Sequence, residues 1–96
     1  MQYLRLKKNL KKSFVGFKHI KLGLLGDTAT QFLAVALRGY GYEAKCDLEI
    51  FEADYNQIEQ QVFNKTSELY SFTPDIVVIA IVVVEFLYEI YFNNIN

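Results

Sequence analysis

The run of nine apolar residues from Ile76 to Val84 constrains the fold of this chain more than any other segment. Most of its side chains are β-branched, which favours a strand over a helix. Apolar character that is continuous rather than alternating is typical of a parallel strand with both faces covered. The run stops at Glu85, well short of the ~20 apolar residues that a membrane span needs. The sequence therefore predicts a buried strand and no membrane span.

Two further strands are predicted before this one. Residues 20–26 form a short apolar run that ends at Gly26, as a central parallel strand does. From Lys45 to Glu52 apolar and charged residues alternate, which is the period of a strand with one solvent-exposed face. We therefore expect the strand at 45–52 to lie at an edge of the sheet.

Helical patterns separate the strands. After the first strand, Asp27 or Thr28 can cap a helix, and Gly39 and Gly41 are expected to end it. The expected apolar face of that helix consists of Ala29, Phe32, Leu33, Ala36 and Leu37.

The second connection is also predicted to be helical. Asp54 followed by Gln57 resembles a capping box, and a break is expected near Asn64. The buried side is expected to continue through Ile58, Val62, Leu69 and Tyr70. Residues 85–96, rich in aromatic side chains, are predicted to form a last helix.

The order β-α-β-α-β requires right-handed crossovers and predicts a three-layer α/β sandwich. The strand order 2-1-3 places the alternating strand at one edge of a short parallel sheet. The long third strand then forms the other edge, where open N–H and C=O groups invite more sheet or another chain. We therefore expect a fragment of a larger domain that also associates with itself.

Charge is distributed unevenly. Residues 1–21 carry seven basic side chains and no acid, whereas the rest carries three bases and eleven acids. Residues 1–19 are predicted to form a basic amphipathic leader helix, and residues 20–96 the α/β domain. The apolar stripe of that helix would consist of Leu4, Leu6, Leu10, Phe14 and Phe17. The main interpretation is a helix packed on an acidic domain, with an anionic partner or a targeting role as alternatives. No nucleic-acid partner is expected.

The lone Cys46 excludes a disulfide framework, and residues 1–21 lack the features of a signal peptide, so a cytoplasmic location is expected.

Ligands of open parallel sheets bind at the carboxyl ends of the strands, where the strand order reverses. Here that point lies between the first and third strands. The candidate ligand-binding residues are Gly26, Asp27, Thr28, Thr30 and Gln31. An anion or hydroxyl bound there would meet the N–H groups at the start of the first helix.

Cofactor and metal sites are disfavoured by spacing and composition. Residues 23–26 lack the glycine spacing of a dinucleotide fingerprint, although Glu52 or Asp54 stands where a ribose-binding acid would. No phosphate-binding loop motif occurs, and one histidine and one cysteine supply few metal ligands. The sequence therefore predicts no cofactor and no metal.

Catalysis would depend on Asp27 and Thr28. Gly26-Asp27-Thr28 has the frame of the Gly-Asp-Ser nucleophile motif of SGNH hydrolases, with threonine in place of serine. A threonine nucleophile needs a base. The only histidine, His19, precedes the first strand at its amino end, and the acids closest to Thr28 would be Glu85 or Asp54. A helix cap is therefore the main interpretation of Asp27 and Thr28, with catalysis as the alternative.

With these residues in place, the stretch from Ile20 to Ala80 resembles the N-terminal SGNH-like domain of FkbH-like proteins, which join it to a haloacid-dehalogenase-like domain. The matching pieces are residues 24–33, residues 52–57, and residues 67–72 running into 74–78. The resemblance implies a flavodoxin-like sandwich in a parent protein that handles phosphorylated three-carbon units and acyl-carrier-protein partners. The catalytic signature of the dehalogenase-like domain is absent from the sequence, and the resemblance is lost after Ala80.

The expected function is a non-catalytic interaction or assembly module of an FkbH-like protein. Its partner would be a second copy, the remainder of the parent protein or an acyl carrier protein. Two alternatives stay open. One is an SGNH-type hydrolase or acyltransferase with Thr28 as nucleophile, and the other is small-ligand or nucleotide binding through Asp27, Thr28, Thr30 and Gln31.

Overall fold

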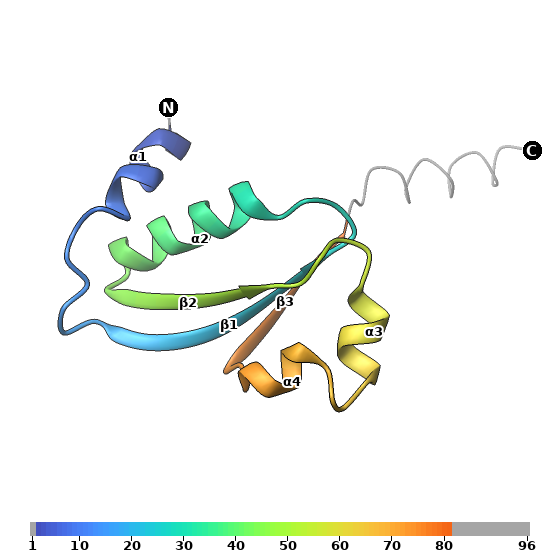
Figure 1. The fold of residues 1–96 in the computed structure, drawn as a ribbon. Coiled ribbons are helices and arrows are strands. Elements are labelled where there is room, and N and C mark those ends of the chain that lie inside the picture. The colour runs from blue at the N-terminus through green and yellow to red at the C-terminus, as the bar shows by residue number, and fades with distance from the viewer. Residues whose placement is uncertain (1, 82–96) are drawn as a thin grey trace, which may run out of the picture.

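The computed structural model describes residues 2–81. Its elements, in chain order, are α1 (Gln2–Asn9), β1 (Lys18–Gly26), α2 (Gln31–Glu43), β2 (Cys46–Glu52), α3 (Ile58–Phe63), α4 (Glu68–Phe72) and β3 (Ile76–Ala80). The strands form a parallel sheet in the order β2-β1-β3, with α1 and α2 on one face and α3 and α4 on the other (Figure 1). The predicted fold class and strand order are confirmed. The helix predicted at 85–96 and the last residues of the predicted third strand lie outside the described part.

β1 is the central strand, since it pairs with β2 and β3, and both of its faces are covered. Leu22 and Leu24 pack with Ala34 of α2, whereas Leu25 faces the other way and packs with Leu69 of α4. Leu24 and Leu25 are fully buried. This explains why the strand reads as a continuous apolar run.

The face by which α2 packs on the sheet differs from the prediction. Ala34 is buried there and Leu37 packs beside it. Phe32 is 73% exposed, and its ring contacts the ring of Tyr3. The helix begins at Gln31, so Ala29 lies outside it. The predicted face was wrong because α2 has two packing partners, the sheet and α1.

Gly39 and Gly41 lie inside α2 and do not end it, contrary to the prediction. Both are buried where another element comes very close. A methyl group added at Gly39 would come within 2.5 Å of the carbonyl oxygen of Leu6, and one at Gly41 within 3.0 Å of Leu48 Cγ. These glycines allow backbone contact on two sides of one helix.

α1 is shorter than the predicted leader helix and ends at Asn9, so Phe14 and Phe17 lie beyond it. Leu6 is its buried apolar residue, and Asn9 is buried as well. The rings of Phe14 and Phe17 stack instead around Tyr42 of α2, with centroid distances of 5.3 and 5.4 Å. No helix within residues 2–81 is long and apolar enough to cross a bilayer.

α3 and α4 are joined through buried polar groups. The N-cap position of α3 is Gln57, and no side chain caps it, so the predicted role of Asp54 as a helix cap is wrong. α3 ends before Asn64, where the break was expected. The side-chain oxygen of Gln61 accepts the N–H of Leu69 at 3.0 Å, and Ser67 Oγ donates to the carbonyl of Gln61 at 2.7 Å.

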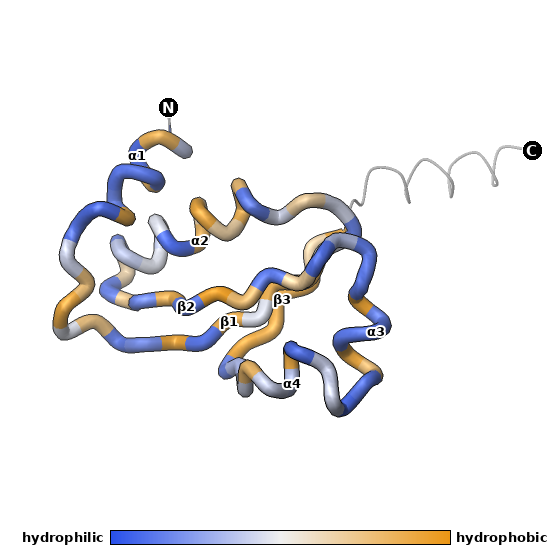
Figure 2. The backbone as a smooth tube through the Cα atoms, viewed as in Figure 1, coloured by the Kyte–Doolittle hydropathy of each residue, from blue (hydrophilic) through white to orange (hydrophobic). Residues whose placement is uncertain are grey.

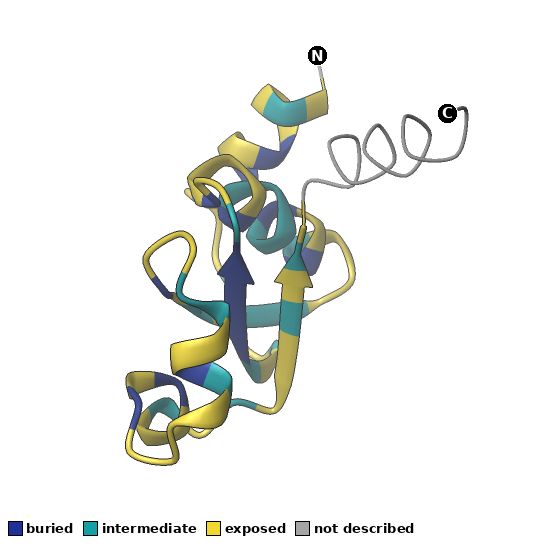
Figure 3. Cartoon of the chain, turned by 90° about the vertical axis from the view of Figure 1, so that its right-hand side faces the viewer, coloured by how far each residue is buried: buried dark blue, intermediate teal, exposed yellow. Residues whose placement is uncertain are grey.

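β3 is exposed along most of its described length, contrary to the prediction of a strand covered on both faces. Ile76 is 47% exposed and Ile79 48%, whereas Val78 packs beside the cluster of Leu22 and Leu24. Figure 3 shows the buried end of β1 next to this exposed strand. The hydropathy colouring marks β3 as apolar in spite of its exposure (Figure 2).

Candidate functional site

The loop that follows β1 is held from two sides. The N–H of Asn56 donates to the carbonyl of Gly26 at 2.9 Å, and the N–H of Asp27 donates to the carbonyl of Ala80 at 3.3 Å. The first bond connects the loop to the segment after β2, and the second to the end of β3. The loop is therefore fixed at the carboxyl end of the sheet, as the sequence predicts.

Gly26 is required by close packing at this turn. A methyl group added there would lie 2.7 Å from Thr30 Cγ2 and 3.3 Å from the carbonyl oxygen of Ala80. The second of these neighbours is backbone, which cannot move aside as a side chain can. The glycine therefore lets the loop pass close to β3.

Thr30, which is buried, orients the start of α2. Its hydroxyl donates to Glu52 Oε1 at 2.9 Å, and its carbonyl accepts the N–H of Ala34 at 2.9 Å. Thr30 occupies the N-cap position of α2, and its side chain makes no capping hydrogen bond. The prediction that Asp27 or Thr28 caps the helix is therefore wrong.

A hollow of about 280 Å³ lies beside this loop. It is lined by Ala29, Thr30, Gln31, Glu52, Ala53, Asp54 and Tyr55. Of the five predicted ligand-binding residues, Thr30 and Gln31 line it, and Gly26, Asp27 and Thr28 do not. The hollow lies on the β2 side of the loop, whereas the crevice was predicted between the first and third strands.

Sequence reasoning missed Tyr55 as a site residue. Its side chain is exposed at the rim of the hollow, three positions beyond the end of β2. A signal existed, since the residues that follow a parallel strand share the carboxyl edge of the sheet with the loop after β1. Glu52 and Asp54, either of which the sequence offered as a ribose-binding acid, line the hollow too.

Thr28 and His19 lie at opposite ends of the sheet. Thr28 is exposed beyond the carboxyl end of β1, whereas His19 is at its amino end. At about 3.3 Å per residue, the strand separates His19 from Gly26 by roughly 23 Å. His19 instead contacts the carboxylates of β2, with Nε2 3.0 Å from Glu49 Oε1 and Nδ1 3.8 Å from Asp47 Oδ2. Of the two acids predicted to lie near Thr28, Asp54 lines the hollow, and Glu85 lies outside the described residues.

The comparisons with known proteins show the family and the fold. A model of the family described as FkbH, N-terminal domain, matches residues 21–95. Among solved structures, the chain is similar to the N-terminal part of the protein BF1531 from Bacteroides fragilis, which contains a phosphatase domain and was solved complexed with Mg. The identity is 39% and the TM-score 0.84 over 91% of this chain, which spans 23% of that one. The comparison with curated proteins found no match.

Proposed function

Because the chain belongs to the FkbH N-terminal domain family, we propose that it acts as a non-catalytic interaction module within a longer FkbH-like protein. The relative of known structure supports this, since it contains a phosphatase domain and this chain corresponds to only 23% of it. The chemistry would then belong to another part of the parent protein.

The observation that carries this proposal is the apolar edge formed by β3. Ile76, Val77 and Ile79 are exposed on a strand that pairs, within residues 2–81, with β1 alone. An apolar groove of about 560 Å³ lies beside it, lined by Val62, Leu69, Tyr70, Thr73, Pro74, Val77 and Ile79. An open strand edge is a template for pairing, and a contiguous apolar patch marks an interaction surface.

The proposed occupant of this edge is the remainder of the parent protein or a second copy of the chain. Both would bury Val77 and Ile79 and would pair with the open N–H and C=O groups of β3. An acyl carrier protein is a further partner that the family resemblance suggests for the parent protein, together with phosphorylated three-carbon substrates. A cytoplasmic location, supported by the unpaired Cys46, belongs to the same proposal.

The first test is the molecular mass in solution, measured by light scattering over a concentration series. We expect a dimer that becomes monomeric when Val77 and Ile79 are replaced by lysine, because the charges would have to be desolvated in the interface. Leu33→Lys, on the exposed side of α2, is the matched control and should leave the dimer intact.

A monomeric chain would direct the test to the parent protein, by hydrogen exchange of the β3 amides. If these amides exchanged as fast in the parent as in the isolated chain, the interaction edge would be refuted. Turnover of p-nitrophenyl acetate that disappears on Thr28→Ala would refute the non-catalytic role and favour the SGNH-type hydrolase. The distance of His19 from Thr28 supports the non-catalytic role.

The hollow at the carboxyl end of β1 and β2 favours a second candidate function, the binding of a small polar ligand. Of the contacts predicted from the sequence, Thr30 and Gln31 line the hollow, and Gly26, Asp27 and Thr28 belong to the loop beside it. Glu52, Asp54 and Tyr55 are added from the hollow. A small polar ligand without phosphate, such as a nucleoside, would raise the melting temperature with the logarithm of its concentration once that concentration exceeds its Kd. Tyr55→Ala should remove that shift, whereas Tyr70→Ala, on the other face of the sheet, should keep it.

A further inference from the structure

The outer edge of β2 is the second open edge of the sheet. The N–H of Ala53 donates to the carbonyl of Leu24, and the carbonyl of Lys45 accepts the N–H of Lys18. Because main-chain groups of successive residues point to opposite sides of a strand, the odd-numbered residues of β2 bond to β1. The N–H and C=O groups of Leu48 and Ile50 therefore point outward, and within residues 2–81 β2 pairs with β1 alone.

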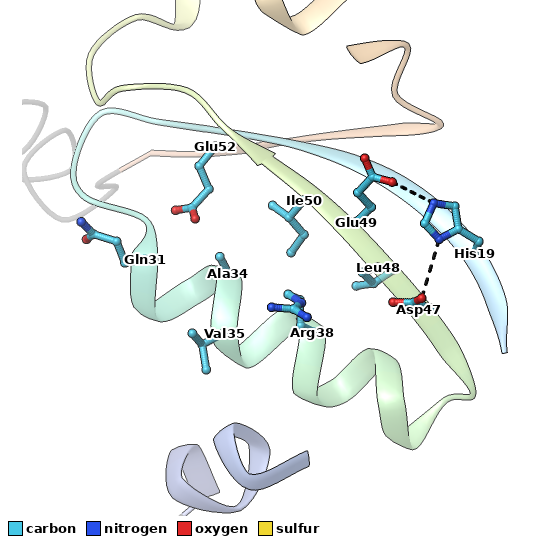
Figure 4. A pocket seen from close by; sticks show the side chains of 10 residues that line it. All are labelled: His19, Gln31, Ala34, Val35, Arg38, Asp47, Leu48, Glu49, Ile50 and Glu52. Atoms are coloured by element: carbon cyan, nitrogen blue, oxygen red, sulfur yellow. Dashed lines mark hydrogen bonds and ion pairs between the residues drawn. The ribbon is translucent and has the colours of Figure 1, made fainter. Parts of the chain in front are cut away.

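A groove of about 510 Å³ follows this edge between β2 and α2 (Figure 4). Val35, Leu48 and Ile50 give it apolar walls. Gln31 and Glu52 line both this groove and the hollow at the carboxyl end of the sheet, so the two adjoin. Together they follow all of β2, a length of roughly 20 Å. An extended peptide of six or seven residues has this length.

The groove carries an excess of negative charge. The carboxylates of Asp47, Glu49 and Glu52 line it, against the guanidinium of Arg38 and the ring of His19. Asp54 adds a fourth carboxylate in the adjoining hollow. Glu49 contacts His19 and Glu52 accepts from Thr30, but an ionised carboxylate has about four acceptor sites and each keeps some of them. This charge repels phosphate, so nucleic acids and anionic membranes are poor occupants.

We propose that the open edge of β2 is a docking site for an extended basic segment of a partner protein, which adds to the sheet as a further strand. Its main chain would pair with the outward N–H and C=O groups of Leu48 and Ile50, and its lysine or arginine side chains would lie beside Asp47 and Glu49. Arg38, which forms no ion pair or hydrogen bond within residues 2–81, has five N–H donors for main-chain carbonyls of the added strand. This site goes beyond the proposed function, because it lies across β1 from β3.

The probe is a dye-labelled hexapeptide of alternating lysine and valine, acetylated and amidated, titrated against the 96-residue chain by fluorescence anisotropy. We expect saturable binding, together with slower hydrogen exchange of the Leu48 and Ile50 amides. A peptide with glutamate in place of lysine should not bind. A lysine peptide N-methylated at alternate residues should not bind either, because it keeps the charge and loses the main-chain donors.

The variant that tests the rim combines Asp47→Lys with Glu49→Lys, and should weaken binding about tenfold. Its matched control combines Glu59→Lys with Glu68→Lys, which make the same charge change on α3 and α4 and should alter the affinity less than about twofold. Absence of binding to the unmodified chain would overturn the proposal. Equal affinity for the N-methylated peptide would overturn it too. Binding would then depend on charge alone, and the carboxylates would serve to protect the edge from pairing with other strands. Neither result depends on what happens at β3.

Discussion

Leu6 of α1 lies so close to Gly39 of α2 that no side chain fits between the two helix backbones. Asn9, one turn further along α1, donates to the carbonyl of Gly39 at 3.2 Å and to Glu43 Oε2 at 3.0 Å. The Nε of Arg5 lies 3.4 Å from the same carboxylate oxygen. The basic helix is therefore held on α2 by one buried close contact and a small polar cluster.

Gly39→Ala should destabilise the chain, although alanine is the better helix former. The substitution gains about 1 kcal/mol of helix propensity. Overpacking against the Leu6 backbone costs about 1–3 kcal/mol, so we expect a net loss of about 1 kcal/mol in urea unfolding. A chain that starts at residue 13 lacks α1 and Leu6, so the same substitution should stabilise it. A loss in both backgrounds would show that Leu6 is not the cause.

Thr30→Val should cost about 1 kcal/mol of unfolding free energy, because it removes the hydrogen bond to Glu52 while keeping the shape of a buried side chain. Thr28→Val is the matched control, two positions earlier on the exposed part of the same loop, and should change stability by less than about 0.5 kcal/mol. Thermal melts of both variants would measure the difference. Equal effects would contradict a specific role of the Thr30 hydroxyl.

Gln61→Leu should destabilise the α3–α4 pair by about 1–3 kcal/mol, since the buried N–H of Leu69 would lose its acceptor. Gln60→Leu changes the neighbouring exposed residue in the same way and should be nearly neutral. Chemical denaturation compares the two variants. A neutral Gln61→Leu would mean that the Leu69 N–H finds another partner.

Val78→Asp should cost about 2–3 kcal/mol and broaden or abolish the cooperative melt, because the carboxylate would enter the cluster of Leu22, Leu24 and Ala34. The neighbouring Val77 is 42% exposed, so Val77→Asp should cost about 1 kcal/mol of unfolding free energy or less. Circular dichroism melts would separate the two. The reverse order would show that β3 presents the opposite face to α2.

The sequence predicted the strands better than the surfaces of the helices. Period-2 alternation at residues 45–52 and continuous apolar character at residues 20–26 depend only on whether one or both faces are covered, so they placed β2 at the edge and β1 at the centre. Exposure of β3 could not be read in the same way. Whether an apolar strand is covered depends on which other elements pack on it, and the residues of the strand itself do not specify those elements.

The errors at α2 and at the candidate site have a common cause. A glycine near the end of a helix can terminate it or admit another backbone, and Gly39 does the latter because Leu6, far away in sequence, lies against it. Thr30 likewise bonds across the chain to Glu52 rather than to its own helix. Local patterns place residues on elements, whereas these contacts depend on tertiary packing.

The strand order also affects how the chain folds while it is being synthesised. Lys18 of β1 pairs with Cys46 of β2. Leu22 of β1 pairs with Ile76 of β3, which lies 54 positions further along the chain. The longer closure costs only about 0.6 kcal/mol more in chain entropy, because that entropy grows with the logarithm of loop length. The timing of synthesis matters more. Once residue 52 has emerged, β1, α2 and β2 can assemble, and the Leu25 side of β1 is covered only as α3 and α4 follow. During synthesis the central strand is therefore covered on one face only, and a chaperone would bind the apolar surface of the other face.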